Sequence, residues 1–207
     1  MKKINLFLVV ALLAAAFFSS CKDDEPNSPA KIGVNINGVV WSPFNVGATG
    51  TFVSKSEDYG GIYQWNRKDT SNFQFYDDYF TIDFTIYNTW LPANDPSPAG
   101  WRVPTIKELE KLMDDKKVRY EYLKQNGISG IKFTDISNKN SIFLPLAGFR
   151  NCYDGVHYRI GERGDYWSST ECEAGSRNAY LLIFDGKYII DYGYFKSNGF
   201  SVRPVAK

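Results

Sequence analysis

Histidine, cysteine and net charge are all scarce in this sequence of 207 residues. His157 is the single histidine, so a histidine-based metal site and a Ser-His-Asp hydrolase both lack the residues that they need. We expect His157 to lie in a surface loop rather than to act in catalysis. Basic and acidic residues number 24 and 23. This near-neutral balance argues against a nucleic-acid-binding protein, which needs a basic face.

Long apolar runs are also lacking, apart from one near the start of the chain. It covers Leu6–Phe18, follows two lysines and is too short to span a bilayer comfortably. These features predict a signal peptide over residues 1–20. Small residues then precede Cys21, which resembles the cleavage box of bacterial lipoproteins. We therefore expect Cys21 to become a lipidated N-terminus; the alternative is an ordinary secretory signal with an incidental cysteine.

The residues after Cys21 resemble an export signal. Lys22-Asp23-Asp24-Glu25 is similar to the lysine-then-acidic segment of surface-exposed bacterial lipoproteins, although such charges are by default simply solvated. Residues 21–30 are polar and contain two prolines, which predicts a flexible tether. We expect an outer-membrane lipid anchor, display on the cell surface, and one folded domain over residues 31–207.

One motif organises the middle of the chain. Thr105 and Glu108 have the spacing of a capping box, Pro104 precedes the cap, and apolar residues then recur on one helical face. The pattern predicts a short amphipathic helix after Thr105. We expect Trp101 to lie in the core and Arg102 to pair with a carboxylate or a loop carbonyl. All five residues are therefore interpreted as structural.

Other patterns are mostly those of β-structure. Residues 117–126 predict a second helix that ends at Gly127. Strands are predicted at 33–36, 39–41, 62–65, 80–86, 131–134, 141–148, 166–170, 179–184, 188–195 and 200–205. Asn37-Gly38 and Asp185-Gly186 are signals for hairpin turns. Helices near the middle and strands toward both ends predict an α+β fold.

Two cysteines remain once Cys21 is assigned to lipid. Cys152 and Cys172 flank a glycine-rich loop, and an oxidising compartment would allow a disulfide between them, which we expect. The alternative, a metal site, lacks ligands. The acidic pairs Asp77-Asp78 and Glu171 with Glu173 could hold calcium, but they show no recognisable loop spacing. We therefore expect solvated charges there, and neither a metal nor a cofactor.

Aromatic residues make up 16% of the chain, which leaves some for a binding surface after the core is built. The tyrosines in or near late loops are Tyr153, Tyr158, Tyr192 and Tyr194, and we expect them to bind a ligand. Trp167 is followed by Ser168-Ser169-Thr170, and an aromatic ring beside hydroxyls suits a sugar. A strand with one buried tryptophan explains that segment equally well. Neither serine has the context of a nucleophile.

Six motifs occur in the order found in the Fibrobacter succinogenes major paralogous domain, FISUMP, which the chain resembles over most of residues 31–207. They are Trp41–Ala48, Tyr63–Trp65, Asp95–Thr105 with Glu108 and Leu112, Phe143–Arg150, Gly164–Thr170 and Ser201–Val205. The resemblance implies a C-type-lectin-like fold with two helices, mostly antiparallel strands and many loops. Ser97 stands where the family usually has a cysteine. The cysteine pairing of the family at that point is therefore absent, which leaves Cys152 and Cys172 for each other.

These observations together favour a non-enzymatic adhesion module on a surface lipoprotein, with a glycan or a surface protein as its partner. One alternative is a structural or accessory subunit of a surface or pilus assembly. Another is an enzyme of formylglycine-generating type, because Trp101–Thr105 is similar to a signature of those enzymes. An exposed aromatic cluster would favour the first. A long, unpaired, hydrophobic edge strand would favour the second, and copper binding by free cysteines the third.

Overall fold

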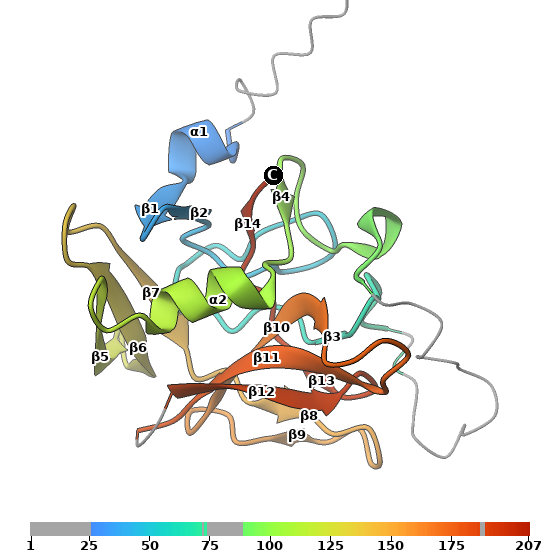
Figure 1. Cartoon of the computed structure of the whole chain (residues 1–207). Coiled ribbons are helices and arrows are strands. Elements are labelled where there is room, and N and C mark those ends of the chain that lie inside the picture. Colours follow the sequence, from blue (N-terminus) through green and yellow to red (C-terminus); the bar gives the residue numbers. More distant parts are fainter. Residues whose placement is uncertain (1–25, 72, 74–88, 187–188) are drawn as a thin grey trace, which may run out of the picture.

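The chain folds into short antiparallel sheets and two small α-helices (Figure 1). The computed structural model describes residues 26–71, 73, 89–186 and 189–207. The helices are α1 (Pro29–Ile32) and α2 (Ile106–Met113), with a 3-10 turn, η2, at Pro92–Asn94. Within the described ranges, no helix is long and apolar enough to cross a membrane. The architecture is therefore mostly antiparallel β-sheet.

The described strands form four sheets. The first has the order β1 (Val34–Ile36), β2 (Val39–Trp41), β14 (Val205–Ala206), β4 (Trp101–Arg102). The second is β10 (Gly164–Glu171), β11 (Asn178–Phe184), β12 (Ile189–Phe195). The third is β3 (Tyr63–Gln64), β13 (Gly199–Phe200), β8 (Phe149–Arg150), β9 (His157–Tyr158). The fourth is β5 (Val118–Gln125), β6 (Ile128–Asp135), β7 (Ser141–Pro145).

Most of the predicted strands are confirmed, with shifted bounds. The strand predicted at 200–205 is instead two short strands, β13 and β14, because the chain leaves one sheet after Phe200 and joins another at Val205. The strand predicted at 80–86 lies outside the described residues. The signal peptide, Cys21 and Lys22–Glu25 lie outside them too.

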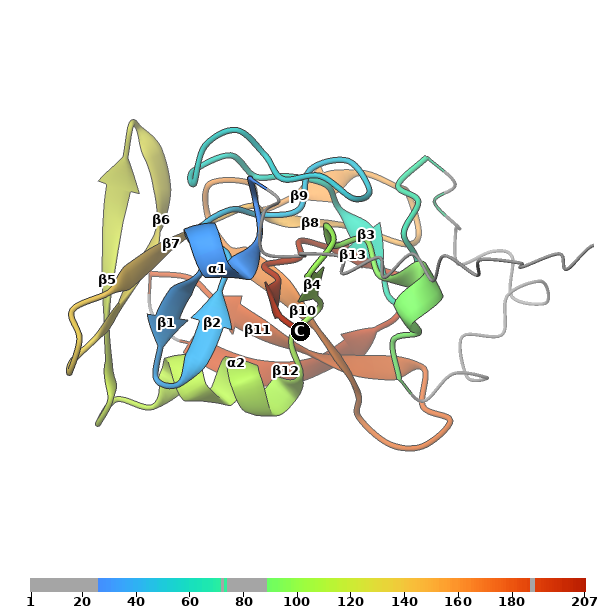
Figure 2. The ribbon, with the colours of Figure 1, turned by 90° about the horizontal axis from the view of Figure 1, so that it is seen from above.

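The two ends of the folded domain meet in the sheet β1–β2–β14–β4 (Figure 2). Asn37 and Gly38 have φ angles of 47° and 75°, as a two-residue hairpin turn requires, and they join β1 to β2. Val205 of β14 lies opposite Trp41 of β2 and Arg102 of β4. The last strand of the chain is therefore held between two segments from its first half.

Helix α2 begins as the sequence predicts. The Thr105 hydroxyl accepts a hydrogen bond from the Glu108 amide at 3.4 Å, and the Glu108 carboxylate accepts one from the Thr105 amide at 2.8 Å. Arg102 donates two hydrogen bonds to the same carboxylate, at 2.6 and 2.8 Å. The buried side chains of the helix are Ile106, Leu109 and Leu112. They form one wall of a hydrophobic core.

Residues 117–126 do not form the predicted helix. Val118–Gln125 is strand β5, which pairs with β6 along its whole length. Asn126 and Gly127 have φ angles of 49° and 87° and make the hairpin turn between these strands. We interpreted Gly127 as a helix end, but Asn-Gly is the stronger signal for a hairpin. Pairing with β6 then outweighs any local helical preference of the segment.

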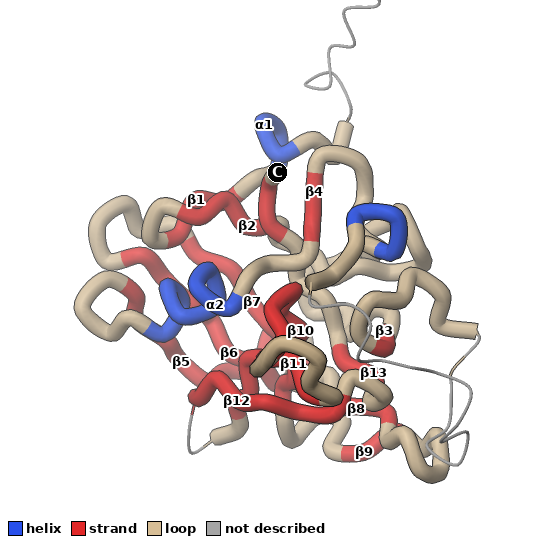
Figure 3. Tube along the Cα trace, turned by 45° about the vertical axis from the view of Figure 1, so that its right-hand side comes forward, coloured by secondary structure: helices blue, strands red, loops and turns tan. Residues whose placement is uncertain are grey.

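The sheet β10–β11–β12 separates two hydrophobic cores, because successive side chains on a strand point to opposite faces. Leu182 and Phe184 of β11 belong to the core that α2 closes. Leu181 and Ile183 belong to the second core. The strands β8, β9 and β13 lie on the side of the second core, away from α2 (Figures 1 and 3). The strands β8, β9 and β13, which cover the second core, therefore lie at the end of the molecule away from α2.

A buried arginine connects three distant segments. Arg203 is fully buried, and its Nε donates a hydrogen bond to Asn45 Oδ1 at 2.8 Å. Its other two nitrogens donate to the carbonyls of Ser42 and Phe143, at 3.2 and 2.9 Å. Burial lowers the pKa of Arg203 to about 10, so the side chain stays charged at neutral pH. Arg203 therefore ties the C-terminal segment to residues 42–45 and to β7.

Candidate functional site: an aromatic surface

Three of the tyrosines that we predicted to bind a ligand come together around Phe149 of β8. The ring centre of Phe149 is 5.8 Å from that of Tyr158 on β9, with nearly parallel planes. It is 6.4 Å from that of Tyr194 on β12. The Tyr192 ring is in turn 6.4 Å from the Tyr194 ring. We call the row Tyr158, Phe149, Tyr194 and Tyr192 the aromatic surface.

The outer members of this row are open to solvent. Tyr192 is 54% exposed and Tyr158 is 40% exposed. Tyr194 and Phe149 are half-buried between them. Tyr153, the fourth predicted tyrosine, is 57% exposed in the turn between β8 and β9. The outer members of the row are thus accessible to a ligand, while its centre is packed into the protein.

The second core provides a firm base for the aromatic surface. The pairing of β8 with β9 places Phe149 directly opposite Tyr158. Phe200 of β13 lies beneath the row, with its ring centre 6.0 Å from Phe149 and 5.6 Å from Tyr194. Because these strands belong to two sheets packed around one core, the spacing of the rings is set by tertiary structure rather than by a loop.

Charged groups border the aromatic surface. The Arg163 guanidinium lies 4.7 Å from the ring centre of Phe149 and pairs with buried Asp165 at 2.9 Å. Burial raises the pKa of Asp165, and the Arg163 charge opposes this rise. Beside it, at the Tyr158 end of the row, the Tyr158 hydroxyl donates to Asp154 at 2.6 Å. This hydrogen bond lowers the pKa of Asp154 and raises that of Tyr158.

This combination suits a ligand with both apolar and hydroxyl-bearing faces. Aromatic rings offer flat apolar area, and a tyrosine hydroxyl or a carboxylate accepts hydrogen bonds at its edge.

His157 is exposed on the short strand β9 rather than in a loop. Partial burial of its ring lowers the pKa of His157, with a further contribution from the Arg150 charge.

Trp167 does not belong to the aromatic surface, which corrects its predicted ligand role. The side chain is fully buried in the second core, and its Nε1 donates to the Tyr63 carbonyl at 2.7 Å. The neighbouring Ser168 hydroxyl donates to the Tyr180 carbonyl at 2.7 Å. The alternative interpretation, a strand with one buried tryptophan, is the correct one for this segment.

Cys152 and Cys172 are both free, which corrects the predicted disulfide. The amide of buried Cys152 donates to the Asn198 side chain at 3.0 Å. The Cys172 sulfur instead packs close to Gly193 of β12. The Cys152 thiol is hydrogen-bonded to the Ser197 side chain, so the two thiols have different neighbours. Burial raises the pKa of both thiols, unlike the lowered pKa of a reactive cysteine.

The predicted acidic pairs do not form a metal site in the part of the chain that the structure describes. Glu171 pairs with buried Lys196 at 2.7 Å and accepts the Gly175 amide at 3.1 Å. The Lys196 ammonium also lies 4.4 Å from the ring centre of Trp65. Asp77-Asp78 lies outside the described residues. Within them, no group of three or more His, Cys, Asp or Glu residues is placed to hold a metal.

The motif around Trp101 lies at the opposite end of the molecule from the aromatic surface (Figures 1 and 3). Trp101 is fully buried, and its Nε1 donates to the Asn27 carbonyl at 2.8 Å. The Pro104 carbonyl accepts the Ser169 amide at 2.7 Å. These contacts, together with the capping box, join the start of α2 to the N-terminal segment and to β10.

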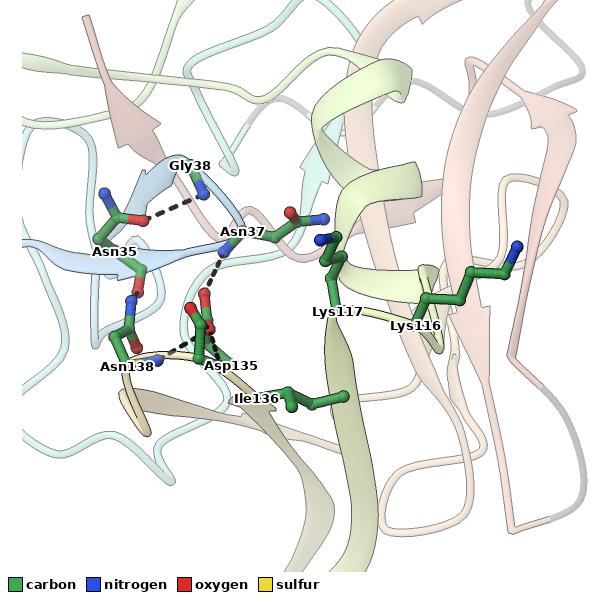
Figure 4. Close-up of a pocket in the computed structure, with 9 residues that line it drawn as sticks. Asn35, Asn37, Gly38, Lys116, Lys117, Asp135, Ile136 and Asn138 are labelled. Carbon is green, nitrogen blue, oxygen red and sulfur yellow. Dashed lines mark hydrogen bonds between the residues drawn. The ribbon is translucent and has the colours of Figure 1, made fainter.

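A separate polar cavity of about 430 Å³ lies between the β1–β2 turn and the β6–β7 turn (Figure 4). Asp135 accepts the amides of Asn37 and Ser137, each at 2.7 Å, and the Ser137 hydroxyl at 2.6 Å. These bonds hold the pKa of Asp135 far below its usual range. Lys116 extends away from this carboxylate. Because the Asp135 carboxylate is already hydrogen-bonded to both turns, we interpret the cavity as structural.

Phe149 and Arg163 are the site residues that sequence reasoning missed. Phe149 lies in the motif Phe143–Arg150, just after the strand predicted at 141–148, but nothing in that motif marks it as a binding residue. Its central position depends on the register with Tyr158 and on the approach of β12, which are contacts between distant residues. Arg163 gives no signal at all in the sequence, because its contact with Phe149 is set by the loop before β10.

Comparison with known proteins places the chain in a family. Its residues 34–206 match the family model of the Fibrobacter succinogenes major domain. No curated protein and no solved structure shows a significant match. The match covers all four sheets and includes every residue of the aromatic surface. The chain therefore belongs to the Fibrobacter succinogenes major domain family.

Proposed function

We propose that this protein is a surface lipoprotein whose folded domain binds a glycan, without catalysis, through the aromatic surface. The observation that carries this proposal is the row of four aromatic rings, with exposed tyrosines at both ends and a half-buried phenylalanine between them. A protein partner is the alternative ligand. The C-type-lectin-like arrangement that the resemblance implies stays a prediction.

A glycan fits this surface better than a small enclosed ligand does. The C–H face of a sugar ring packs on an aromatic ring, and its hydroxyls reach hydrogen-bonding groups at the ring edge. Here Asp154 and the Tyr158 hydroxyl lie at one end of the row. Successive rings about 6 Å apart suit an extended chain of sugars rather than a single one.

The proposed anchor would present this surface outward. We propose that Cys21 carries the lipid, that Lys22–Glu25 directs the protein to the cell surface, and that the protein sits in the outer membrane. The described chain begins beside α1 and the C-terminus, whereas β8, β9 and β12 lie at the other end of the molecule (Figures 1 and 3). A tether on the first end would leave the aromatic surface facing away from the membrane.

A binding assay with matched tyrosine variants tests the proposed ligand. The purified chain is applied to a glycan array, and its affinity for the best glycan is then measured for Tyr192→Ala and Tyr158→Ala. Loss of a stacked ring should weaken binding at least about tenfold. Tyr120→Ala is the control, because Tyr120 is 48% exposed on β5, outside the row. Absence of any glycan binding, or equal loss in all three variants, would reject the proposal.

The proposed lipid anchor and the proposed export signal are tested separately. Cys21→Ser should abolish incorporation of a labelled fatty acid. Replacement of Lys22–Glu25 by alanines should protect the protein from protease added to whole cells while leaving lipidation intact. Unchanged protease sensitivity would show that these four residues are not the export signal.

A catalytic role of formylglycine-generating type receives little support from the cysteines. The thiols are free, as such chemistry needs, but burial raises the pKa of each. We propose that neither binds copper. Titration of the purified chain with Cu(I) checks this, with the double variant Cys152→Ser, Cys172→Ser as the control.

A further inference from the structure

Strand β12 has a long outer edge that no described strand pairs with. It is the last strand in the order β10–β11–β12. Its seven residues, Ile189–Phe195, pair one to one with β11, with no bulge to bend the strand away. Figure 1 shows it at the front of the molecule. A straight edge of this length is a template for pairing with another strand.

The composition of β12 lacks the usual protection of an exposed edge. Asp191 is its only charged residue, and it contains neither lysine nor proline. Its exposed large apolar side chains are Ile190, Tyr192 and Phe195. The other exposed long strand, β5, carries Arg119, Glu121 and Lys124. Charges of this kind hinder strand pairing, so β5 is protected and β12 is not.

The hydrogen bonds of the β11–β12 ladder show which peptide groups of β12 point outward. Lys196 N donates to Arg177 O, one step beyond the pair Asn178–Phe195. Hydrogen-bonded pairs alternate along an antiparallel ladder. Ile190, Tyr192 and Tyr194 therefore turn their peptide groups toward β11. The peptide groups of Asp191 and Gly193, on either side of Tyr192, point away from the sheet.

We propose that the outer edge of β12 pairs with β12 of a second copy of this chain, antiparallel and centred on Tyr192. In this register Asp191 lies opposite Gly193 of the second copy, and the same pair occurs twice by symmetry. The outward peptide groups of both residues are then satisfied, and no like charges lie directly opposite each other. The edge is self-complementary, which favours a second copy over an unrelated strand.

This pairing would join two sheets into one of six strands. It would also bring the two Tyr192 rings together as a directly opposed pair on the same face as Tyr194, so the two aromatic surfaces would meet at the two-fold axis. The inference rests on the edge of β12 and holds whether or not the surface binds a glycan. The assays are separate, since one measures self-association and the other measures glycan affinity.

Site-directed cross-linking in the full chain tests the register. In a parent carrying Cys152→Ser and Cys172→Ser, Tyr192→Cys is oxidised and run on a non-reducing gel. Directly opposed residues of a non-hydrogen-bonded pair have Cα atoms about 4.5 Å apart, which a disulfide can bridge. We expect a covalent dimer from Tyr192→Cys but not from Tyr120→Cys, whose position is comparably exposed. The parent without a new cysteine gives the background.

Sedimentation of the otherwise unchanged chain provides a second measurement. The protein should sediment as a dimer, Tyr192→Lys should make it a monomer, and Tyr120→Lys should leave it a dimer. Circular dichroism checks that each variant is folded. A monomer at every concentration, a dimer that survives Tyr192→Lys, or equal cross-linking at positions 120 and 192 would overturn the proposal. Cross-linking of Tyr192→Cys to a different protein would also overturn it, because the occupant would not be a second copy.

Discussion

Arg203 is a buried cation that donates hydrogen bonds to three uncharged acceptors: the Asn45 side chain and the carbonyls of Ser42 and Phe143. These partners come from segments about 60 and 160 positions away in the sequence. Each would become an unsatisfied buried acceptor without the guanidinium, which is costly in a protein interior. Arg203 therefore acts as the hydrogen-bond donor that the centre of the fold depends on.

We predict that Arg203→Met lowers the free energy of unfolding by about 3 kcal/mol or more, because several buried acceptors lose their partner at once. Urea denaturation followed by tryptophan fluorescence measures the change. Arg159→Met is the matched control: Arg159 is exposed and pairs with Glu162 at 3.1 Å, and an exposed pair contributes under about 1 kcal/mol. Similar losses in both variants would contradict the role given to Arg203.

Glu57 connects the loop at residues 55–58 to the β5–β6 turn. Its carboxylate accepts hydrogen bonds from the side chains of Asn126 at 2.6 Å and Gln125 at 3.1 Å. These bonds, with that of Asn126 the larger contributor, lower the pKa of Glu57 from 4.5 to about 2. A carboxyl group with a lowered pKa in the folded state stabilises that state only while it is ionised.

We predict that this contribution is present above pH 4.5 and is lost as the pH falls toward 2. The urea midpoint of the wild-type chain should therefore fall more steeply over this range than that of Glu57→Gln. The experiment compares midpoints at a series of pH values. Glu110→Gln, on the exposed side of α2, should follow the wild-type curve. Parallel curves for wild type and Glu57→Gln would show that the carboxylate makes no pH-dependent contribution.

At the scale of elements, local signals predicted best where one residue pair decides the structure. The Thr105–Glu108 capping box and the Asn37-Gly38 hairpin turn appear as predicted. The prediction of a helix at residues 117–126 was wrong, because their pattern is compatible with both a helix and a β-strand. Pairing with β6 makes the segment a strand. The predicted ligand role of Trp167 and the predicted disulfide were wrong for a related reason. Short motifs do not show which side chains are buried or which distant chain segments come together.

The hairpin turn between β5 and β6 can be tested directly at Gly127. Gly127 has a φ of +87°, and a Cβ added there would meet nothing within 4 Å. We predict that Gly127→Ala lowers the free energy of unfolding by about 1 kcal/mol, through backbone strain alone. Gly186→Ala is the control, because that position is equally open but has no positive φ. Chemical denaturation of the two variants measures the difference, and equal stability would contradict the strained turn.

At the scale of the whole molecule, the positions of the strands could be predicted from the sequence, but the order in which they pair to form sheets could not. The row of rings in the aromatic surface depends on β8, β9 and β12, which belong to two sheets. Three of its four residues were predicted as aromatic binding residues, but Phe149, which holds them together, was not. Sheet order follows from contacts between residues far apart in the chain, and a single sequence carries few signs of those contacts.

Strand β14 joins the first and second halves of the chain, because it pairs with β2 on one side and β4 on the other. We predict that deletion of residues 205–207 abolishes cooperative thermal unfolding, since β2 and β4 then lose their shared partner and buried Val205 is missing. Differential scanning calorimetry measures this. Lys207→Ala keeps the strand and should unfold like the wild type. A sharp transition in the deletion variant would show that the first sheet does not need its last strand.

The docking of both chain ends at one place has a further consequence. Trp101 Nε1 donates to the carbonyl of Asn27, and the Lys207 amide donates to the carbonyl of Gly100. The first and last described segments therefore lie side by side, and a short linker could close the domain into a ring. Circular permutation at an exposed turn should then preserve the fold. The same geometry would allow the whole domain to be inserted into a surface loop of another protein.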